Sequence, residues 1–202
     1  MVRILIAAIL GAIVHYGYNA FAWTAAPWHN MTMNRIDQER EALENLEPHL
    51  PNDGVYVFPA PQHSADMSAE ERSTAWSEWQ DFHEQGPIGM IFYRSAGAPA
   101  MLPTTFAVGF AFSLVASLLA STAVFISRGS MPSYWGGVLI VTLLGIFVAI
   151  NGPLMGWNWL WMPTDHSLAM VLDHVLGWLL VGLVSSAIIK APARGSQSSP
   201  TG

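Results

Sequence analysis

The chain contains no cysteine and unusually few charged residues. Without cysteine it can form no disulfide, hold no iron–sulfur cluster or thiolate-bound metal, and use no cysteine nucleophile. Charged residues make up 11% of the sequence, less than half of the share of about 25% that is usual in soluble proteins. The charges are missing above all from four apolar stretches, at 4–22, 104–126, 136–152 and 167–189.

Asp173 is the only Asp, Glu, Lys or Arg within these four stretches. Apolar segments of about 17–25 residues are typical of membrane-spanning helices. We therefore predict a mainly α membrane protein with four transmembrane helices, the first within 1–22 and the other three within 104–189. Residues 23–103 are expected to form a small α+β extracytoplasmic cap between helices 1 and 2, and 190–202 a disordered cytoplasmic tail.

The basic residues outside the cap predict the orientation. Arg3 precedes the first span, Arg128 lies between the second and third, and Lys190 and Arg194 follow the fourth. Basic residues in short loops collect on the cytoplasmic side of a membrane. We therefore expect a multi-pass protein with both termini in the cytoplasm and the cap on the other side.

The first span also has features of a secretory signal. An apolar run over 4–14 follows Arg3, and Ala20-Phe21-Ala22 fits an A-x-A cleavage site. Against cleavage, residues 15–19 include two tyrosines, and aromatic residues at this depth suit a retained helix that ends among the headgroups. Both outcomes remain open, and a retained helix is the one we expect.

Within the cap, the sequence predicts two helices and two short strands. The helices are expected over 35–47 and 68–85, and the strands over 55–58 and 89–93. We expect the strands to pair with each other. Because a two-stranded ribbon is only marginally stable alone, the cap is expected to rest on the helix bundle.

The second cap helix has clear end signals. Ser68 and Glu71 form a capping-box pattern, and Gly86 followed by proline is a stop signal. Trp76, Trp79 and His83 recur at helical spacing, which predicts one aromatic face.

Two further patterns concern the spans. Small residues recur every fourth position in the second span, at Gly109, Ser113, Ser117 and Ser121, and such faces let helices approach closely. The third span is expected to end near 151–153, where a proline follows Asn-Gly.

A few polar residues lie at matching depths inside the spans. His15 precedes Ala22 by seven residues and Asp173 follows His166 by seven, which places both roughly 10 Å below the outer boundary. We predict that Asp173 faces the bundle core and meets His15 or Tyr18, because a carboxylate exposed to lipid is costly. The candidate polar pocket consists of His15, Tyr18, Asn19, Asn151, Asp173 and His174. It could fix helix packing, bind a ligand or carry protons or ions.

Two metal or cofactor hypotheses follow from the histidines. His29, Met31 and Met33 form an H-x-M-x-M cluster whose imidazole and thioether groups suit copper, although all three also flank a predicted helix start. His15 and His174 could ligate a haem between the first and fourth spans.

Enzyme signatures are missing from the sequence. It contains no G-x-S-x-G, P-loop or Rossmann pattern, so the sequence favours a non-enzymatic protein and leaves enzymatic activity open. An acidic cap and few basic residues disfavour nucleic-acid binding.

Several short motifs in the chain are similar to motifs of another group of proteins. They are Pro27-Trp28-His29, Gly54-Val-Tyr-Val-Phe-Pro59, Asn158-Trp159 and the Asp173…Gly177-Trp178…Gly182 pattern. Together they resemble a group of small four-span bacterial inner-membrane proteins without an assigned activity. The resemblance implies an architecture and a bacterial inner (plasma) membrane, and it implies no catalytic residue.

Two functions fit these observations best, and a third, a small transporter, would require the chain to form oligomers. The first is a non-enzymatic accessory or interaction protein that docks a membrane protein partner or a second copy in the lipid bilayer. The alternative is a binder of a lipid, quinone, haem or copper ion near the polar pocket.

Overall fold

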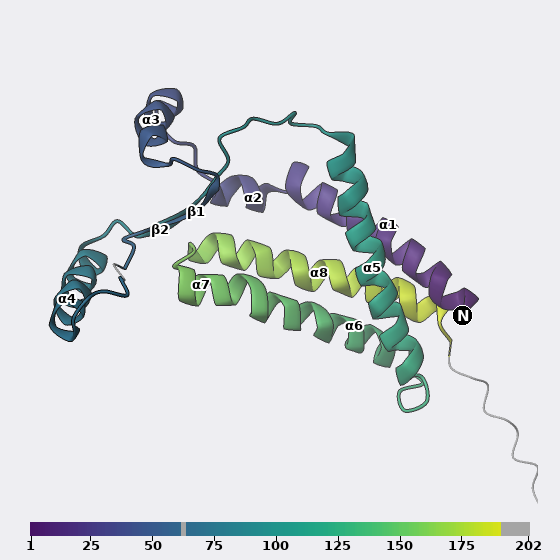
Figure 1. Cartoon of the computed structure of the whole chain (residues 1–202). Helices are drawn as coiled ribbons and strands as arrows, with labels where there is room; N and C mark the ends of the chain where they lie inside the picture. Colours follow the sequence, from purple (N-terminus) through teal and green to yellow (C-terminus); the bar gives the residue numbers. More distant parts are fainter. Residues whose placement is uncertain (62–63, 191–202) are drawn as a thin grey trace, which may run out of the picture.

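In the computed structural model, which describes residues 1–61 and 64–190, the chain is mostly helical, at 71%, with one small two-stranded sheet. Figure 1 shows a bundle of long helices with an insert projecting from one end. The elements are α1 (Val2–Thr24), α2 (Pro27–Thr32), α3 (Glu39–Leu46), the 3-10 turn η1 (Glu47–His49), β1 (Gly54–Phe58), α4 (Ala69–Gln85), β2 (Gly89–Tyr93), α5 (Pro103–Ser127), α6 (Tyr134–Ala149), the π-helical turn η2 (Ile150–Leu154), α7 (Met155–Leu160) and α8 (Thr164–Ile188).

Four helical runs are long and apolar enough to cross a membrane: α1, α5, α8 and the run Tyr134–Trp159. They alternate in direction. The start of α1, the α5–α6 turn and the end of α8 lie at one end of the bundle, and the insert 25–102 lies at the other (Figure 1). The predicted tail 190–202 falls outside the described residues except for Lys190.

The predicted end of the third span is wrong. The helix does not stop near 151–153 but continues through η2 into α7 and ends at Leu160. Pro153 lies inside η2, and because proline has no N–H and crowds the preceding turn, it disrupts a regular α-helix. The wider π-turn accommodates it. The tryptophan-rich segment 157–160 therefore forms the last turns of this run.

Small residues form the contacts between the long helices. Ser113, Ser117 and Ser121 of α5 are buried, as the four-residue pattern predicted. On α6, a Cβ added to Gly145 would lie 2.6 Å from the Cβ of Trp178 on α8. Helices therefore pack close enough that glycine is required at this contact.

Arg128 closes the end of the bundle opposite the insert. Its side chain is 4% exposed. It donates from Nε to the Ile189 carbonyl at 2.6 Å, from Nη1 to the Ser133 carbonyl at 2.6 Å and from Nη2 to the Ser186 carbonyl at 3.0 Å. The planar guanidinium suits this three-way contact, and its charge is favourable beside the C-terminal end of α8.

In the insert, β1 and β2 pair with each other as predicted, and they run antiparallel, with Val55 opposite Phe92 and Val57 opposite Met90. The capping box of α4 is also confirmed: the Glu71 N–H donates to Ser68 Oγ at 3.2 Å and the Ser68 N–H donates to Glu71 Oε2 at 2.7 Å.

The other insert helix differs from the prediction. Instead of starting at residue 35, α3 begins at Glu39 after Gln38, which adopts a left-handed conformation with φ of 50°. A helix cannot extend backward through a left-handed residue, since its backbone hydrogen bonds need right-handed geometry throughout.

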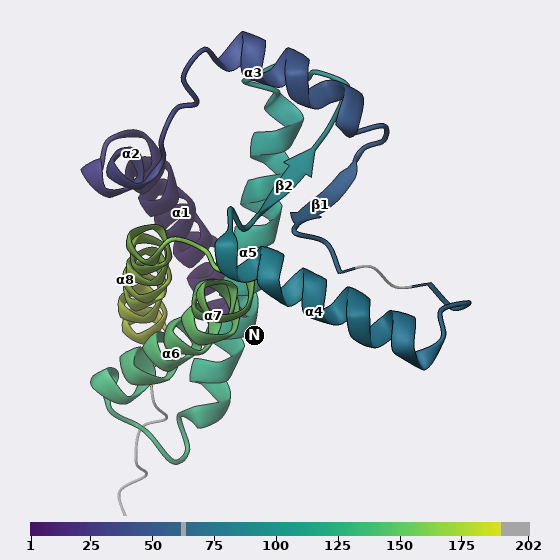
Figure 2. The same ribbon diagram turned by 90° about the vertical axis from the view of Figure 1, so that its left-hand side faces the viewer.

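The insert has little core of its own. Neither α3 nor α4, both fully described, contains a buried residue. Figure 2, seen along the bundle, shows α4 extending away to one side of the long helices. A ring contact of 5.7 Å between His83 and Trp161 links α4 to the bundle, so the cap meets the bundle at this edge while most of its surface stays exposed.

Candidate functional site

A short helix folds back from the end of α1 and brings two side chains to Asp173. After Thr24 the chain passes through extended Ala26, and Pro27 opens α2 at its first turn, where proline lacks only an N–H that the helix does not need. The resulting α2 packs against α8.

Asp173 accepts three hydrogen bonds from two other helices. On Oδ1 it accepts from the Tyr18 hydroxyl of α1 at 3.2 Å and from Trp28 Nε1 of α2 at 3.0 Å. On Oδ2 it contacts His29 Nε2 at 2.5 Å. Asp173 is 5% exposed and His29 is fully buried. A carboxylate this deep is tolerable only because charge-assisted bonds replace its lost water.

Aromatic and polar neighbours hold His29 in place. The Trp23 ring, in the last turn of α1, stacks on the His29 ring at 3.9 Å with planes 11° apart. The Thr32 hydroxyl donates to the His29 carbonyl at 3.2 Å. The oxygen of this hydroxyl also lies 3.2 Å from His166 Nδ1 on α8. The imidazole therefore has a fixed orientation toward Asp173.

The two nitrogens of His29 have different surroundings. Nε2 faces Asp173, whereas Nδ1 is buried and has no hydrogen-bond partner among the described residues. A protonated ring would carry an N–H at both nitrogens and would leave one of them buried and unpaired. The geometry therefore favours a neutral ring that donates from Nε2.

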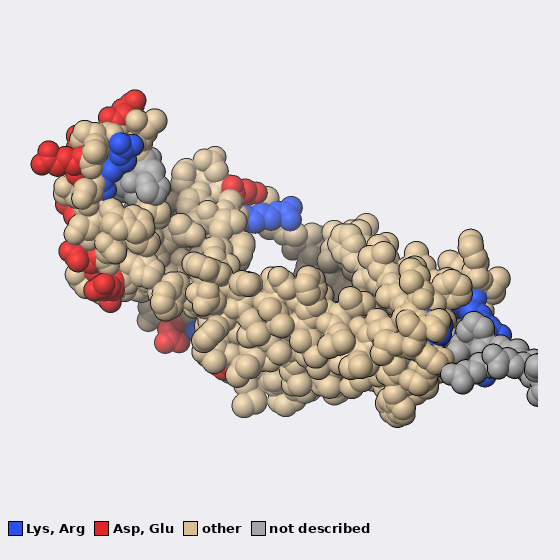
Figure 3. All heavy atoms as spheres, turned by 90° about the horizontal axis from the view of Figure 1, so that it is seen from below, with Lys and Arg blue, Asp and Glu red and all other residues tan. Residues whose placement is uncertain are grey.

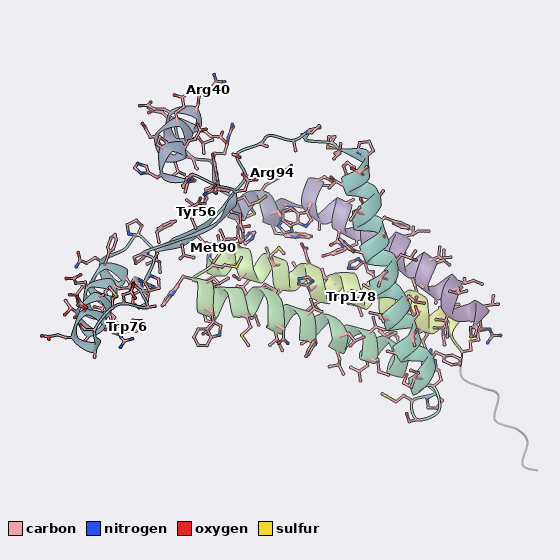
Figure 4. All side chains as sticks on the ribbon, viewed as in Figure 1. Arg40, Tyr56, Trp76, Met90, Arg94 and Trp178 are labelled. Carbon is pink, nitrogen blue, oxygen red and sulfur yellow. The ribbon has the colours of Figure 1, made fainter. Side chains whose placement is uncertain are left out.

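A second polar group lies one turn deeper. The Ser113 hydroxyl of α5 lies 3.2 Å from His15 Nδ1, and Asn19 Nδ2 lies 3.3 Å from the same nitrogen. The His15 ring also packs on Trp178 of α8, with centroids 4.8 Å apart, and Figure 4 labels this tryptophan within the bundle.

Gly177 separates these two polar groups. It follows Asp173 by one helical turn, and a Cβ at this position would lie 3.2 Å from His15 Cδ2 and 3.4 Å from Tyr18 Cδ1. Glycine therefore allows both side chains of α1 to lie flat against α8.

The structure brings together only part of the predicted pocket. Asp173 faces the core and meets Tyr18, one of its two predicted partners, while His15 and Asn19 form the deeper group. His174 is half-buried beside them on α8. Asn151 does not join this layer: it is exposed in η2, and its amide donates to the Phe147 carbonyl of its own helix at 2.9 Å. The continuation of the third span through η2 explains this error.

The predicted metal and haem ligands are also placed differently. His29 is buried against Asp173, whereas Met31 is 75% and Met33 47% exposed. No group of three or more His, Asp or Glu side chains placed to hold a metal occurs within 1–61 and 64–190. His15, proposed with His174 as a haem ligand, packs on Trp178 and bonds Ser113. These positions give the copper and haem hypotheses no support.

Sequence analysis missed Trp28 and His29 as the partners of Asp173. If the first span simply continued outward as a straight helix, Trp28 and His29 would lie beyond its end and outside the bundle. The signal that could have found them is Pro27, which favours the first turn of a helix and so predicts that the chain turns back.

This arrangement joins three helices more readily than it binds a ligand. Donors from the chain itself occupy both oxygens of Asp173; His29 and Asp173 are buried, and Tyr18 and Trp28 are half-buried. We call Tyr18, Trp28, His29 and Asp173 the carboxylate cluster. No protein-family model, curated protein or solved structure matches the chain.

Proposed function

We propose that the chain is a four-span protein of a bacterial inner membrane that acts as a non-enzymatic interaction protein through its insert. The four apolar helical runs support the spans, and the sequence resemblance supports the bacterial membrane. Both termini lie in the cytoplasm in this proposal, since Arg3, Arg128 and Lys190 occur at one end of the bundle. The first span is retained, because cleavage after Ala22 would remove Tyr18 from the carboxylate cluster.

The observation that carries the interaction role is an uncovered apolar face on the ribbon. Val55, Val57, Met90 and Phe92 lie on one side of β1 and β2, and we call them the ribbon face. Val55 is 58%, Val57 44% and Phe92 78% exposed. Clustered apolar side chains in water are typical of surfaces that bind another protein.

The charge around this face indicates the kind of partner. Segment 23–103 contains twelve acidic and four basic residues, a net charge of −8. Figure 3 shows most of the acidic side chains gathered over the insert and basic ones at the opposite end of the bundle. Like charges repel when two copies meet, so the partner proposed is a different protein with basic side chains around an apolar contact.

The alternative, a ligand held in the polar pocket, has less support. The carboxylate cluster is occupied by the chain's own donors, and Asn151 points away from it. A lipid, quinone, haem or copper ion would have to displace these bonds.

The test is purification of the full-length protein from its native membranes in mild detergent at low ionic strength. A stoichiometric second protein should co-purify, carry an excess of Lys and Arg on its exposed domain, and dissociate as salt is raised. Phe92→Ser should abolish the complex, because it removes the most exposed apolar side chain of the ribbon face.

Met101→Ser is the matched control, since Met101 is 73% exposed but lies outside the ribbon. The control should keep the complex. A homodimer, or a complex that survives Phe92→Ser, would overturn the proposed surface. A coloured or metal-loaded preparation without a second protein would favour the ligand-binding alternative.

A further inference from the structure

An open groove lies where the insert meets the bundle. Its walls are the ribbon end, with Val57 and Met90, the face of α4, with Trp79 and His83, and the bundle end, with Trp161. Its volume of about 610 Å³ falls within the range of roughly 300–1,000 Å³ that is usual for small-molecule sites.

Three contacts fix the positions of the walls relative to one another. Trp79 Nε1 donates to the Pro59 carbonyl at 3.1 Å, which ties α4 to the end of β1. The His83 ring packs 5.1 Å from Trp79 and 5.7 Å from Trp161. The groove is therefore built by specific side-chain contacts among three elements.

The lining indicates an uncharged occupant. Among the described residues that line the groove none is Asp, Glu, Lys or Arg, and the apolar part of the lining comes from aromatic rings, prolines and aliphatic side chains. This is notable in an insert with a net charge of −8. An ion or a charged headgroup would find no countercharge in this lining, whereas a hydrocarbon chain would gain apolar contacts.

The position of the groove indicates where the occupant comes from. The groove continues into Trp159 and Trp161, which are 72% and 62% exposed at the end of the third apolar run. Exposed tryptophans at a span end are typical of the headgroup level of a bilayer. Figure 4 labels Met90 on the part of β2 nearest this end. The groove thus joins the surface that lipid covers if the chain spans a membrane.

From these observations we infer that the groove holds an acyl chain of a phospholipid from the adjacent outer leaflet. The inference rests on the membrane insertion proposed above and does not require the protein partner, although both occupants would use the ribbon face. The ribbon face is divided accordingly: Val57 and Met90 line the lipid groove, while Val55 and Phe92 remain for the partner.

The test uses the purified full-length protein in nanodiscs that contain a phosphatidylcholine with a diazirine near the end of one acyl chain. After illumination, peptide mapping locates the lipid adducts. We expect adducts on the four spans and, in addition, on the groove segments 76–94 and 157–161.

Val57→Trp fills the groove and should lower the groove adducts at least about fivefold while leaving the span adducts unchanged. Val55→Trp is the matched control, because Val55 lies two residues away on the same face of β1 and does not appear in the described lining. It should leave the groove adducts intact. Met90→Trp fills the same groove from β2 and replaces Val57→Trp if that variant fails to elute as a monodisperse peak.

Every other labelling result would contradict either the lipid groove alone or the groove together with membrane insertion. Adducts on the spans alone would overturn the lipid groove and leave membrane insertion standing. Groove adducts that persist in both filling variants would show unspecific surface labelling and would also overturn it. Adducts on no segment would overturn the groove together with the proposed membrane insertion.

Discussion

At the scale of single residues, the carboxylate cluster is the most demanding feature of the protein. Asp173 is 5% exposed and its oxygens are satisfied by Tyr18, Trp28 and His29. A buried carboxylate that loses one of these donors keeps the cost of its burial without full compensation from hydrogen bonds. The cluster therefore makes the docking of α2 on α8 an all-or-none contact.

Asp173→Asn is expected to destabilise the fold by about 2–4 kcal/mol. The amide removes the charge and directs N–H groups at a site where all three neighbours are donors. Thermal unfolding in detergent, followed by near-ultraviolet circular dichroism, should show a Tm lowered by roughly 4–16 °C.

The control for this substitution is Asp165→Asn, an exposed carboxylate at the start of the same helix. It should change stability by no more than about 0.5 kcal/mol. His29→Ala should resemble Asp173→Asn, and the double variant should lose much less than the sum, because both act on one contact. Fully additive losses would contradict the cluster.

At the scale of elements, the long helices depend on glycine at their crossings. A Cβ on Gly145 would lie 2.6 Å from Trp178 Cβ and 2.9 Å from the His174 carbonyl oxygen. Neither atom is the free end of a flexible side chain, so the two helices would have to separate.

Gly145→Ala should therefore destabilise the bundle by about 1–3 kcal/mol, measured by thermal unfolding in the same detergent. Gly17→Ala is the matched control on another long helix, since a Cβ there would meet nothing within 4 Å. The control should be neutral or slightly stabilising because alanine favours helix. Equal losses in both variants would contradict close packing at Gly145.

The start of α4 should respond to pH. The Ser68 backbone N–H, and next the Ser68 side chain, lower the pKa of the exposed Glu71 carboxyl below its ordinary value of 4.5. A lowered pKa in the folded state means that the carboxylate stabilises the helix start above about pH 4.5, and that this contribution is lost as the pH falls through the lowered pKa.

A carbon-detected NMR titration of the Glu71 side chain should give a midpoint below 4.5. Ser68→Ala keeps the backbone donor but removes the hydroxyl, so the midpoint should move only part of the way back. A midpoint at or above 4.5 in the unmodified protein would show that the capping box is not formed.

Some features of these elements can be predicted from the sequence and others cannot. Periodicity and end signals predicted the β1–β2 pairing, the limits of α4 and the buried serines of α5, because each depends on local patterns. The return of α2, the π-turn at Pro153 and the contacts of Arg128 depend on how separate helices meet. Pro27 signals the return of α2 only indirectly, and no pattern within one segment places His29 beside Asp173 or takes Asn151 out of the polar pocket.

At the scale of the whole molecule, the two ends differ in charge and structure. The insert end carries a net charge of −8 over 23–103, while basic Arg3 and Arg128 occur at the other. Arg128 is itself locked into the α5–α6 turn and the end of α8. Arg128, one of the basic residues on which the proposed orientation rests, therefore also joins α5, α6 and α8.

The orientation can be tested directly because the chain has no cysteine to give background labelling. Glu78→Cys, on the exposed surface of α4, should react with a membrane-impermeant maleimide in intact spheroplasts. Ser130→Cys, exposed in the α5–α6 turn, should react only after the membrane is permeabilised. Reaction at residue 130 alone in intact spheroplasts would invert the topology, and equal reaction at both positions would mean that these helices do not separate two compartments. The predicted pattern would place the ribbon face and its acidic surroundings outside the cytoplasm, where the proposed partner would have to meet them.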